Sequence, residues 1–153
     1  MSQYAAISRT NYFRITDRAA FEADLERHGL SVGTFDGYAD LVLDNDHGRV
    51  ALFGVEGWPS LDEDAVAARL GIEDEDTPLP TDYDIFADLI AAHLVDGEVA
   101  ILVEIGKEKF RYLGGTAVAV NSAGEQKMID LDDIYGLARE LTSDSAAITP
   151  PYS

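Results

Sequence analysis

The sequence predicts an α+β fold, a two-layer sandwich in which a mainly antiparallel sheet carries its helices on one face. The predicted elements follow the order β-α-β-β-β-α-α-β-β-β-α, which a decorated ferredoxin-like unit would fit. Most neighbouring strands are separated by tight turns, which join antiparallel rather than parallel strands. The chain has 153 residues, 46% of them apolar, which is enough for one core. We therefore expect a single domain over residues 1–143 and a flexible tail over 144–153.

The first predicted elements are a strand and a helix. Residues 10–15 (TNYFRI) are rich in aromatic and β-branched side chains, as strands are. Thr16 is expected to cap a helix that ends at Gly29. Phe21 and Leu25 lie one turn apart and are expected to face inward.

An antiparallel meander is predicted next. Asp36-Gly37 is typical of a two-residue turn and predicts a β-hairpin within residues 30–44. The polar residues 45–48 predict a second turn, which leads into a strand over 49–55.

The middle of the chain is predicted to form a helix and an acidic loop. Ser60 and Glu63 have the spacing of a capping box, which predicts a helix over 61–70. Pro78 and Pro80 remove amide donors and favour extended backbone, so the loop before them is not expected to be helical.

The last part of the chain is predicted to contain a helix, three strands and a final helix. Thr81 and Asp84 are expected to cap the first of these helices. Its inward face is expected to hold Phe86, Leu89, Ile90 and His93. In the strand 98–105, branched apolar residues alternate along one side. Asp130 is expected to cap the final helix. The inward face of that helix is expected to hold Ile134, Leu137, Ala138 and Leu141.

The net charge of −18 is concentrated in the middle third of the chain. Residues 61–106 hold 13 acids and one base, and no Lys or Arg occurs from Leu70 through Gly106. Such a surface repels nucleic acid, anionic lipid and phosphorylated substrates, and it attracts basic proteins. The charge therefore argues against direct binding to nucleic acid or membrane and predicts a basic protein as the partner.

The spacing of the acidic residues is similar to that of phosphates along a nucleic-acid strand. Alternate residues of an extended segment lie about 6.6 Å apart, which would apply within residues 73–76. Helical residues i and i+4 lie about 5 to 6 Å apart, which would apply to Asp84 and Asp88. Trp58, which precedes the acidic region, is a candidate binding anchor, with a core position under a loop as the alternative. The predicted contact set comprises Asp62, Glu63, Asp64, Glu73, Asp74, Glu75, Asp76, Asp82, Asp84, Asp88 and Trp58.

The sequence contains no motif that predicts a cofactor or a metal. It lacks G-x-S-x-G, the P-loop pattern and G-x-G-x-x-G. Residues 114–116 (GGT) predict a strand bulge rather than a phosphate cradle. Residues 44–48 (DNDHG) resemble the start of a calcium loop, but the twelfth position from Asp44 is Val55 rather than glutamate. We therefore predict no cofactor, no metal and no catalytic residue.

One weaker catalytic alternative is a His/carboxylate enzyme. His93 beside Asp88 or Tyr83 would be the general base, although a histidine on an apolar helix face is more often a packed core residue. The constellation expected around a catalytic base is missing from the sequence.

These observations predict a non-enzymatic acidic binding module. The first interpretation is an inhibitor of a nuclease, of the anti-CRISPR or anti-restriction type, that imitates nucleic acid. An immunity protein that neutralises a basic toxin is the second. A salt-adapted soluble protein is the third, because Asp outnumbers Glu by 18 to 11 and only three residues are Lys. A homodimer formed through an exposed strand edge is also open.

The segment 96–141 resembles a group of small uncharacterised bacterial proteins, some encoded by phages or plasmids, that share a strand-turn-strand-helix ending. The resemblance covers about a third of the chain and includes no catalytic motif. It implies a mobile-element setting and no particular activity, and the acidic loop lies outside it.

The chain contains no cysteine, so it forms no disulfide, which fits a reducing compartment. The N-terminal residues lack a basic start followed by an apolar run, and no stretch approaches the roughly 18 apolar residues of a membrane span. We therefore expect a soluble, cytoplasmic protein.

Overall fold

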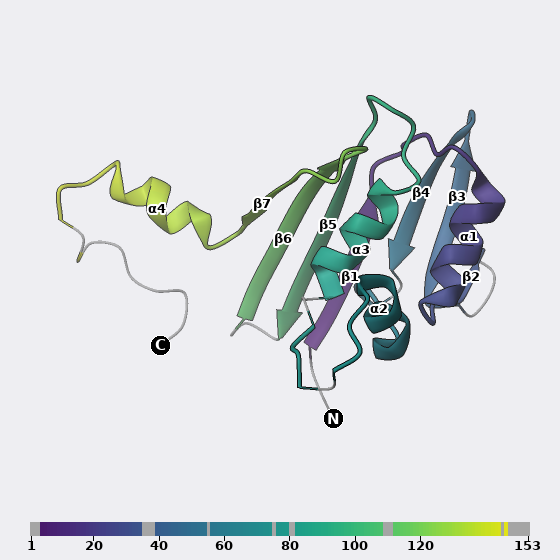
Figure 1. Cartoon of the computed structure of the whole chain (residues 1–153). Helices are drawn as coiled ribbons and strands as arrows, with labels where there is room; N and C mark the ends of the chain where they lie inside the picture. The colour runs from purple at the N-terminus through teal and green to yellow at the C-terminus, as the bar shows by residue number, and fades with distance from the viewer. Residues whose placement is uncertain are drawn as a thin grey trace.

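A computed structural model describes residues 4–34, 39–54, 56–74, 76–79, 82–108, 112–144 and 146 (Figure 1). The elements follow the predicted order. The strands are β1 (Tyr4–Thr10), β2 (Val32–Gly33), β3 (Leu41–Asp46), β4 (Arg49–Gly54), β5 (Val99–Glu108), β6 (Tyr112–Asn121) and β7 (Gln126–Asp130). The helices are α1 (Arg18–Arg27), α2 (Glu63–Leu70), α3 (Asp82–Ala91) and α4 (Asp133–Arg139). Within the described residues, no helix is long and apolar enough to cross a membrane.

All seven strands belong to one sheet with the order β2-β3-β4-β1-β5-β6-β7. Every neighbouring pair is antiparallel except β2 and β3. Strands β1 and β3 are both antiparallel to β4, which lies between them, so β1-α1-β3 is a split βαβ unit. With α3 and β5, these elements make up a ferredoxin-like core, to which β2, α2, β6, β7 and α4 are added. The predicted α+β class is confirmed.

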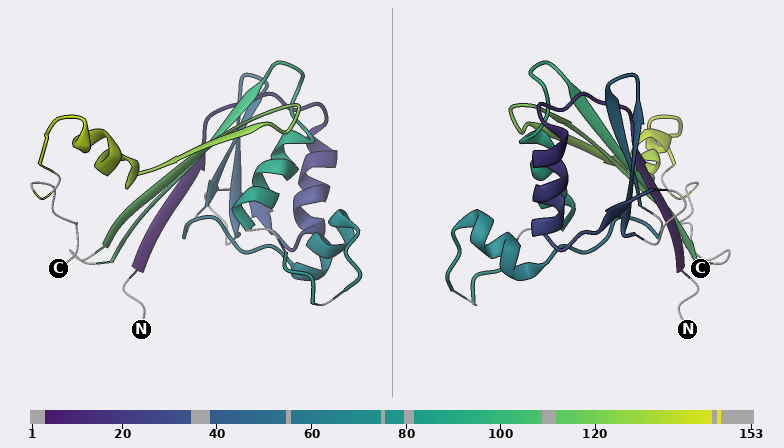
Figure 2. Two further views of the ribbon diagram at one scale, coloured as in Figure 1. Left: turned by 60° about the vertical axis from the view of Figure 1, so that its left-hand side comes forward. Right: turned by 90° about the vertical axis from the view of Figure 1, so that its right-hand side faces the viewer.

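Helices α1, α2 and α3 lie on one face of the sheet, as Figure 2 shows from two sides. The main core lies between these helices and the sheet. Phe21 and Leu25 of α1, Leu89 of α3, Leu52 of β4 and Leu102 of β5 have no exposed surface. The inward positions predicted for α1 are therefore confirmed.

Three helices begin at other residues than predicted. Asp17 rather than Thr16 caps α1, because its carboxylate accepts a hydrogen bond from the amide of Ala20 at 3.2 Å. Asp62 rather than Ser60 caps α2 in the same way. The N-cap of α4 is Asp132 rather than Asp130. The predicted cap Thr81 of α3 lies outside the described residues.

Strand β1 ends at Thr10, the residue at which the predicted strand 10–15 begins. Strand β1 pairs with both β4 and β5, whereas the predicted strand 10–15 forms only isolated bridges at Phe13 and Ile15 after Thr10. The aromatic residues of this stretch contribute to the core instead, since Phe13 is 1% exposed.

The predicted hairpin within residues 30–44 is wrong, because β2 runs parallel to β3. Ser31 and Asp40 hold the ends of the connecting loop together. The Asp40 carboxylate accepts bonds from the amide and the hydroxyl of Ser31, and the amide of Leu41 donates to the carbonyl of Ser31. The expected turn residues Asp36 and Gly37 lie outside the described part of the chain.

The bulge predicted at residues 114–116 is also absent from the described pairing. The register of β5 and β6 runs without a break from Glu108↔Tyr112 to Val99↔Asn121. Gly115 instead makes room for a neighbour, since a Cβ atom there would lie 3.1 Å from the side chain of Leu131.

Helix α4 lies beyond the edge of the sheet and none of its residues is buried (Figures 1 and 2). Ile134 and Leu137 are each 57% exposed, and Leu141 is 90% exposed. The prediction that this apolar stripe faces inward is therefore wrong, because β7 directs the chain away from the helical layer. Most of the predicted tail after residue 143 lies outside the described residues.

Candidate functional site

Helix α2 and the loop that follows it enclose a hollow of about 610 Å³, which we call the acidic hollow. Four carboxylate residues of the predicted contact set line it together: Glu63, Asp64, Glu73 and Asp74. The remaining lining is formed mainly by small and apolar residues: Ala67, Ala68, Ile72, Thr77 and Leu79. The site therefore combines apolar and anionic lining residues.

The local sequence explains how this hollow forms. The cap at Asp62 places Glu63 and Asp64 in the first turn of α2, where both are exposed. Gly71 ends the helix in the left-handed conformation at φ 70°, which glycine adopts without a Cβ penalty. The amide of Ile72 then donates to the carbonyl of Ala67 at 2.9 Å, which turns the chain back along the helix.

The acidic loop turns rather than extending. The Asp74 carboxylate accepts a hydrogen bond from the amide of Asp76 at 2.9 Å, and the Asp74 carbonyl accepts one from the amide of Thr77. The expectation of an extended row of acids over residues 73–76 is therefore wrong for Asp74 and Asp76. Glu75 lies outside the described residues.

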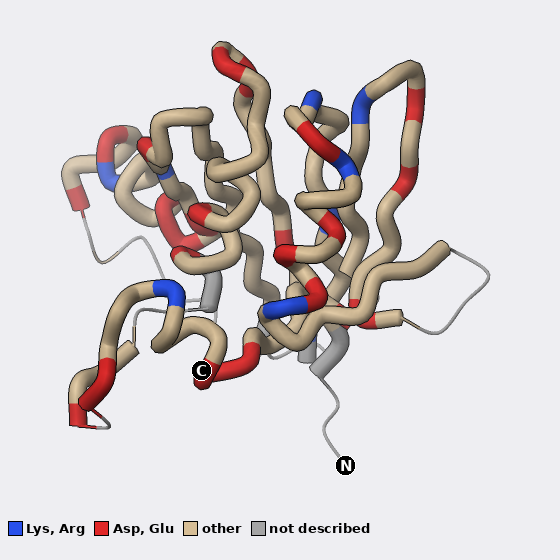
Figure 3. Tube along the Cα trace, turned by 45° about the vertical axis from the view of Figure 1, so that its right-hand side comes forward, with Lys and Arg blue, Asp and Glu red and all other residues tan. Residues whose placement is uncertain are grey.

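No ion pair within the described part of the chain involves the four carboxylates of the acidic hollow. The one base of α2, Arg69, lies 3.4 Å from the carboxylate of Asp24 on α1 instead. The charge of the hollow is thus not neutralised by a described ion pair. Figure 3 shows that acidic residues also lie along many other parts of the chain.

The other acids of the predicted set occupy different positions. Asp62 caps α2, and Asp76 is exposed in the loop. Asp82 is the first residue of α3, and Asp84, two residues later, is half-buried. Asp88 is exposed on α3, where its carboxylate accepts a hydrogen bond from the side-chain amide of Gln126 at 2.9 Å. The structure thus brings four of the predicted acids together at one hollow.

Trp58 packs half-buried against the core. Its ring centroid lies 5.0 Å from that of Phe86 on α3, and its amide donates to the carboxylate of Glu104 at 2.7 Å. Its indole nitrogen is buried without a hydrogen-bond partner among the described residues. A role as a binding anchor stays a prediction.

A second group of charged residues, which the sequence did not reveal, lies inside the helical layer. The carboxylate of Asp24 on α1 lies 2.8 Å from Nε2 of His93, 3.2 Å from Nη1 of Arg27 and 3.4 Å from Nη1 of Arg69. Nδ1 of His28 lies 2.7 Å from the carbonyl oxygen of Asp24. We call these five residues the Asp24 cluster. Through Arg69 and His93, the cluster connects α1 with α2 and with the chain just after α3.

The Asp24 cluster corrects the prediction for His93, whose carboxylate partner is Asp24 rather than Asp88. The side chain of Tyr83 lies outside the described part of the structure. Burial raises the pKa of Asp24, but the hydrogen bond from His93 and the charges of Arg69, His93 and His28 outweigh it, so the pKa lies below its ordinary value of 3.8. A carboxylate held ionised among several donors is a weak base. The arrangement therefore fits a structural connection between helices.

Sequence reasoning could not find the Asp24 cluster because Arg69 and His93 are far from Asp24 in the chain. No local motif links residues 24, 69 and 93. Among the described residues, no group of three or more His, Asp or Glu side chains could hold a metal ion.

No protein-family model matches this chain, and no curated protein or solved structure is similar to it. The class that the fold defines is an α+β domain with a ferredoxin-like core. Any function must therefore be argued from the site itself.

Proposed function

We propose that this protein is a non-enzymatic binding module that uses its acidic hollow to engage a cationic surface of another protein. The observation that carries the proposal is the meeting of four carboxylates around one hollow without a described base to neutralise them. An unpaired anionic concavity attracts cations more strongly than scattered surface charge does, because its walls focus the field.

The composition of the hollow suits Lys or Arg side chains in particular. Such side chains place their methylene stems on apolar surface and keep their charged ends near polar groups. Ala67, Ala68 and Leu79 offer the apolar surface, while Glu63 and Glu73 offer carboxylates to the charged end. Arginine would gain further from bidentate contacts with these carboxylates.

The partner that fits this proposal best is a nuclease or another nucleic-acid-binding effector with a basic groove. Such a groove normally binds phosphates, whose charge the carboxylates would replace. The protein would then act as a competitor of DNA or RNA, as an inhibitor encoded by a mobile element would. The same proposal places it in the cytoplasm, which the absence of cysteine supports.

The test compares two variants with the same change in charge. One neutralises the hollow, with Glu63→Gln, Asp64→Asn, Glu73→Gln and Asp74→Asn. The control neutralises four exposed acids elsewhere, with Glu26→Gln, Asp46→Asn, Glu56→Gln and Asp96→Asn. Each tagged protein is used to capture partners from a host lysate at low and high salt, and captured proteins are purified for titration.

We expect the wild type and the control to capture the same basic protein at low salt, and duplex DNA to compete with them. Each exposed ion pair contributes up to about 1 kcal/mol, so loss of the hollow should weaken binding about 10- to 100-fold and flatten its salt dependence. Equal affinity of the two variants would exclude the hollow as the interface. The identity of the captured protein separates a nuclease from a basic toxin.

A further inference from the structure

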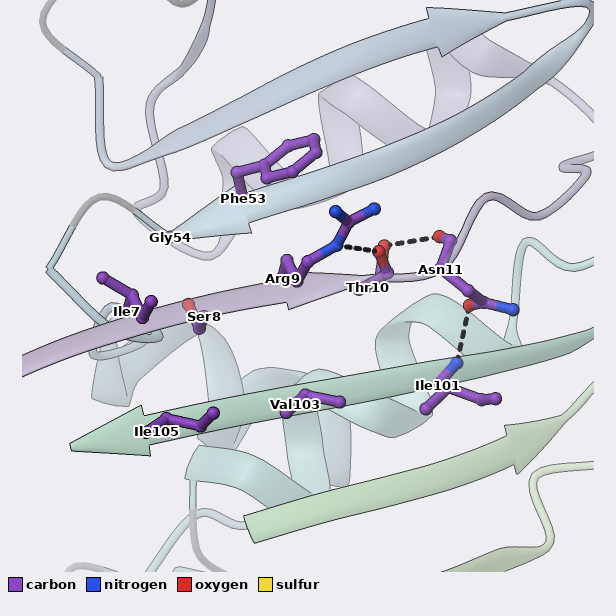
Figure 4. A pocket seen from close by; sticks show the side chains of 10 residues that line it. All are labelled: Ile7, Ser8, Arg9, Thr10, Asn11, Phe53, Gly54, Ile101, Val103 and Ile105. Atoms are coloured by element: carbon purple, nitrogen blue, oxygen red, sulfur yellow. Dashed lines mark hydrogen bonds between the residues drawn. The ribbon is translucent and has the colours of Figure 1, made fainter. Parts of the chain in front are cut away.

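The face of the sheet opposite the helices is largely apolar, and no described helix or strand covers it. Alternate residues of β1 and β5 point to this side, where they line a groove of about 640 Å³ (Figure 4). Ile7 is 68% exposed, and Ile105, which pairs with it, is 54% exposed. Ile101, Val103 and Phe53 complete the apolar lining. We call this surface the outer sheet face.

On β1, β5, β6 and β7, the charge of the outer sheet face is opposite in sign to that of the whole chain, whereas β3 places Asp44 and Asp46 on this side. The register of the strands places Arg9, Lys107 and Lys127 on this side, opposite Val103, Leu113 and Ala119 respectively. The guanidinium of Arg9 lies 4.9 Å from the centroid of the Phe53 ring. Among the described residues of β1, β5, β6 and β7, none of the positions on this side is a carboxylate.

Helix α4 has the complementary properties. Its exposed apolar residues have the i, i+3, i+7 spacing of one helical stripe: Ile134, Leu137 and Leu141. Asp132, Asp133 and Glu140 flank the stripe with negative charge, which Arg139 offsets in part. The chain thus carries an apolar, basic sheet face and an apolar, acidic helix that do not cover each other.

The junction between β7 and α4 holds the helix away from its own sheet. The amide of Leu131 donates to the carbonyl of Gly115 at 2.9 Å, and the amide of Asp130 donates to the carboxylate of Asp133 at 2.8 Å. The side chain of Leu131 fills the space beside Gly115. Folding α4 back onto its own sheet would break these contacts, so they favour the position of the helix beyond the sheet edge.

We propose that two copies of this chain form a twofold dimer in which α4 of each copy packs its apolar stripe on the outer sheet face of the other. The exchange is reciprocal, so each copy buries both its face and its helix, as an isologous interface requires. A standard interface buries roughly 800 Å² per partner, and the reciprocal exchange uses each contact twice toward that area. The acidic hollow lies on the helical side of the sheet, so this dimer is independent of the proposed function.

The experiment measures the molar mass of the full chain by light scattering after size exclusion. Leu137→Asp changes the helix, Ile105→Asp changes the outer sheet face, and Leu70→Asp changes a control residue that is 41% exposed on α2. Far-UV circular dichroism shows that each variant is folded. We expect twice the 16.6 kDa chain mass for the wild type and the control, and the single chain mass for the other two variants.

Mixing the two monomeric variants tests the exchange directly. The intact helix of the Ile105→Asp chain can still pack on the intact face of the Leu137→Asp chain, so one of the two contacts is restored. We expect the mixture to form heterodimers that neither variant forms alone. A wild-type chain that is monomeric at a concentration on the order of 100 μM, far above a micromolar Kd, would overturn the dimer. Because one contact supplies about half of the binding free energy, the mixture is measured at about millimolar concentration, where a mixture that stays monomeric would overturn the exchange.

Discussion

Replacing Asp24 with Asn removes one negative charge from the helical layer while keeping the shape of the side chain. Asp24 is 6% exposed and connects Arg27 of its own helix with Arg69 of α2 and with His93 after α3. The substitution leaves Arg69 without the carboxylate that it contacts. We therefore expect a less stable protein and a looser attachment of α2.

The size of the effect follows from the exposure of the partners. A hydrogen bond to a charged group stabilises a protein by about 1.5 to 3 kcal/mol when it is buried. The Arg27 side chain is 70% exposed and can be rehydrated, so its pair contributes at most about 1 kcal/mol. The side chains of Arg69 and His93 are only 26% and 15% exposed, so the loss of their contacts with the Asp24 carboxylate costs more stability. We expect the free energy of unfolding to fall by about 2 to 3 kcal/mol.

Urea unfolding of both proteins across a pH series measures this loss. The pKa of Asp24 is lower in the folded protein than its ordinary value of 3.8. Its stabilising contribution is therefore fully present above the unfolded pKa and is lost as the pH falls through the folded pKa. The difference in unfolding free energy between wild type and Asp24→Asn should therefore shrink as the pH falls below 3.8.

The exposed pair Arg18–Glu22 on the same helix provides the control, since its side chains are 48% and 36% exposed. Glu22→Gln should change the stability by less than about 0.5 kcal/mol. If Asp24→Asn lowers the unfolding free energy at neutral pH by no more than Glu22→Gln does, the stabilising role of Asp24 is refuted. It is also refuted if the difference between wild type and Asp24→Asn does not shrink in acid.

Three further substitutions test the backbone and the core, each by urea unfolding. Gly71→Ala should cost about 1 kcal/mol, because Gly71 has a φ of 70° and open space around it, so only the backbone is strained. Gly54→Ala should cost more, at least about 2 kcal/mol, because a Cβ atom there would collide with the hydroxyl of Ser8 and the carbonyl of Gly57. Leu102→Ala should cost about 2 to 5 kcal/mol, since Leu102 is fully buried. Equal losses for Gly71→Ala and Gly54→Ala would contradict the assigned causes.

Much of the fold was predictable because it depends on local signals. Glycine at position 71 ends its helix as expected, and the polar turn before β4 joins two antiparallel strands. The parallel pairing of β2 was not predictable, because the sequence gives no sign of the hydrogen bonds between Ser31 and Asp40 that close the loop. Local turn residues indicate where a chain bends, whereas the direction in which it returns depends on tertiary contacts.

The alternation along β5 shows a second limit. Val99, Ile101 and Ile105 form the larger apolar side, yet they point to the uncovered face, while Ala100 and Leu102 point to the core. A strand that is apolar on both sides is typical of a sheet covered on both faces. An apolar stripe indicates that a face needs cover, but the sequence does not say which segment or which molecule provides it. For the same reason, the sequence wrongly predicted that the apolar stripe of α4 packs on its own core.

The candidate site was predictable in part. The concentration of charge pointed to the region of α2 and its loop, where four of the predicted acids meet. The separate position of Asp88 was not predictable, because it depends on a hydrogen bond from Gln126 of β7. Charge counts identify an anionic region, and only the fold decides which carboxylates share one concavity.

The middle position of β1 in the sheet has a consequence for biosynthesis. Its two neighbours end at Gly54 and Glu108, so a nascent chain carries this strand without one of its pairing partners until more than a hundred residues have been translated. Pairing between such distant segments slows folding, and an unpaired strand edge invites association with other chains. Late closure of the sheet, after β5 has been translated, is the folding route that this topology favours.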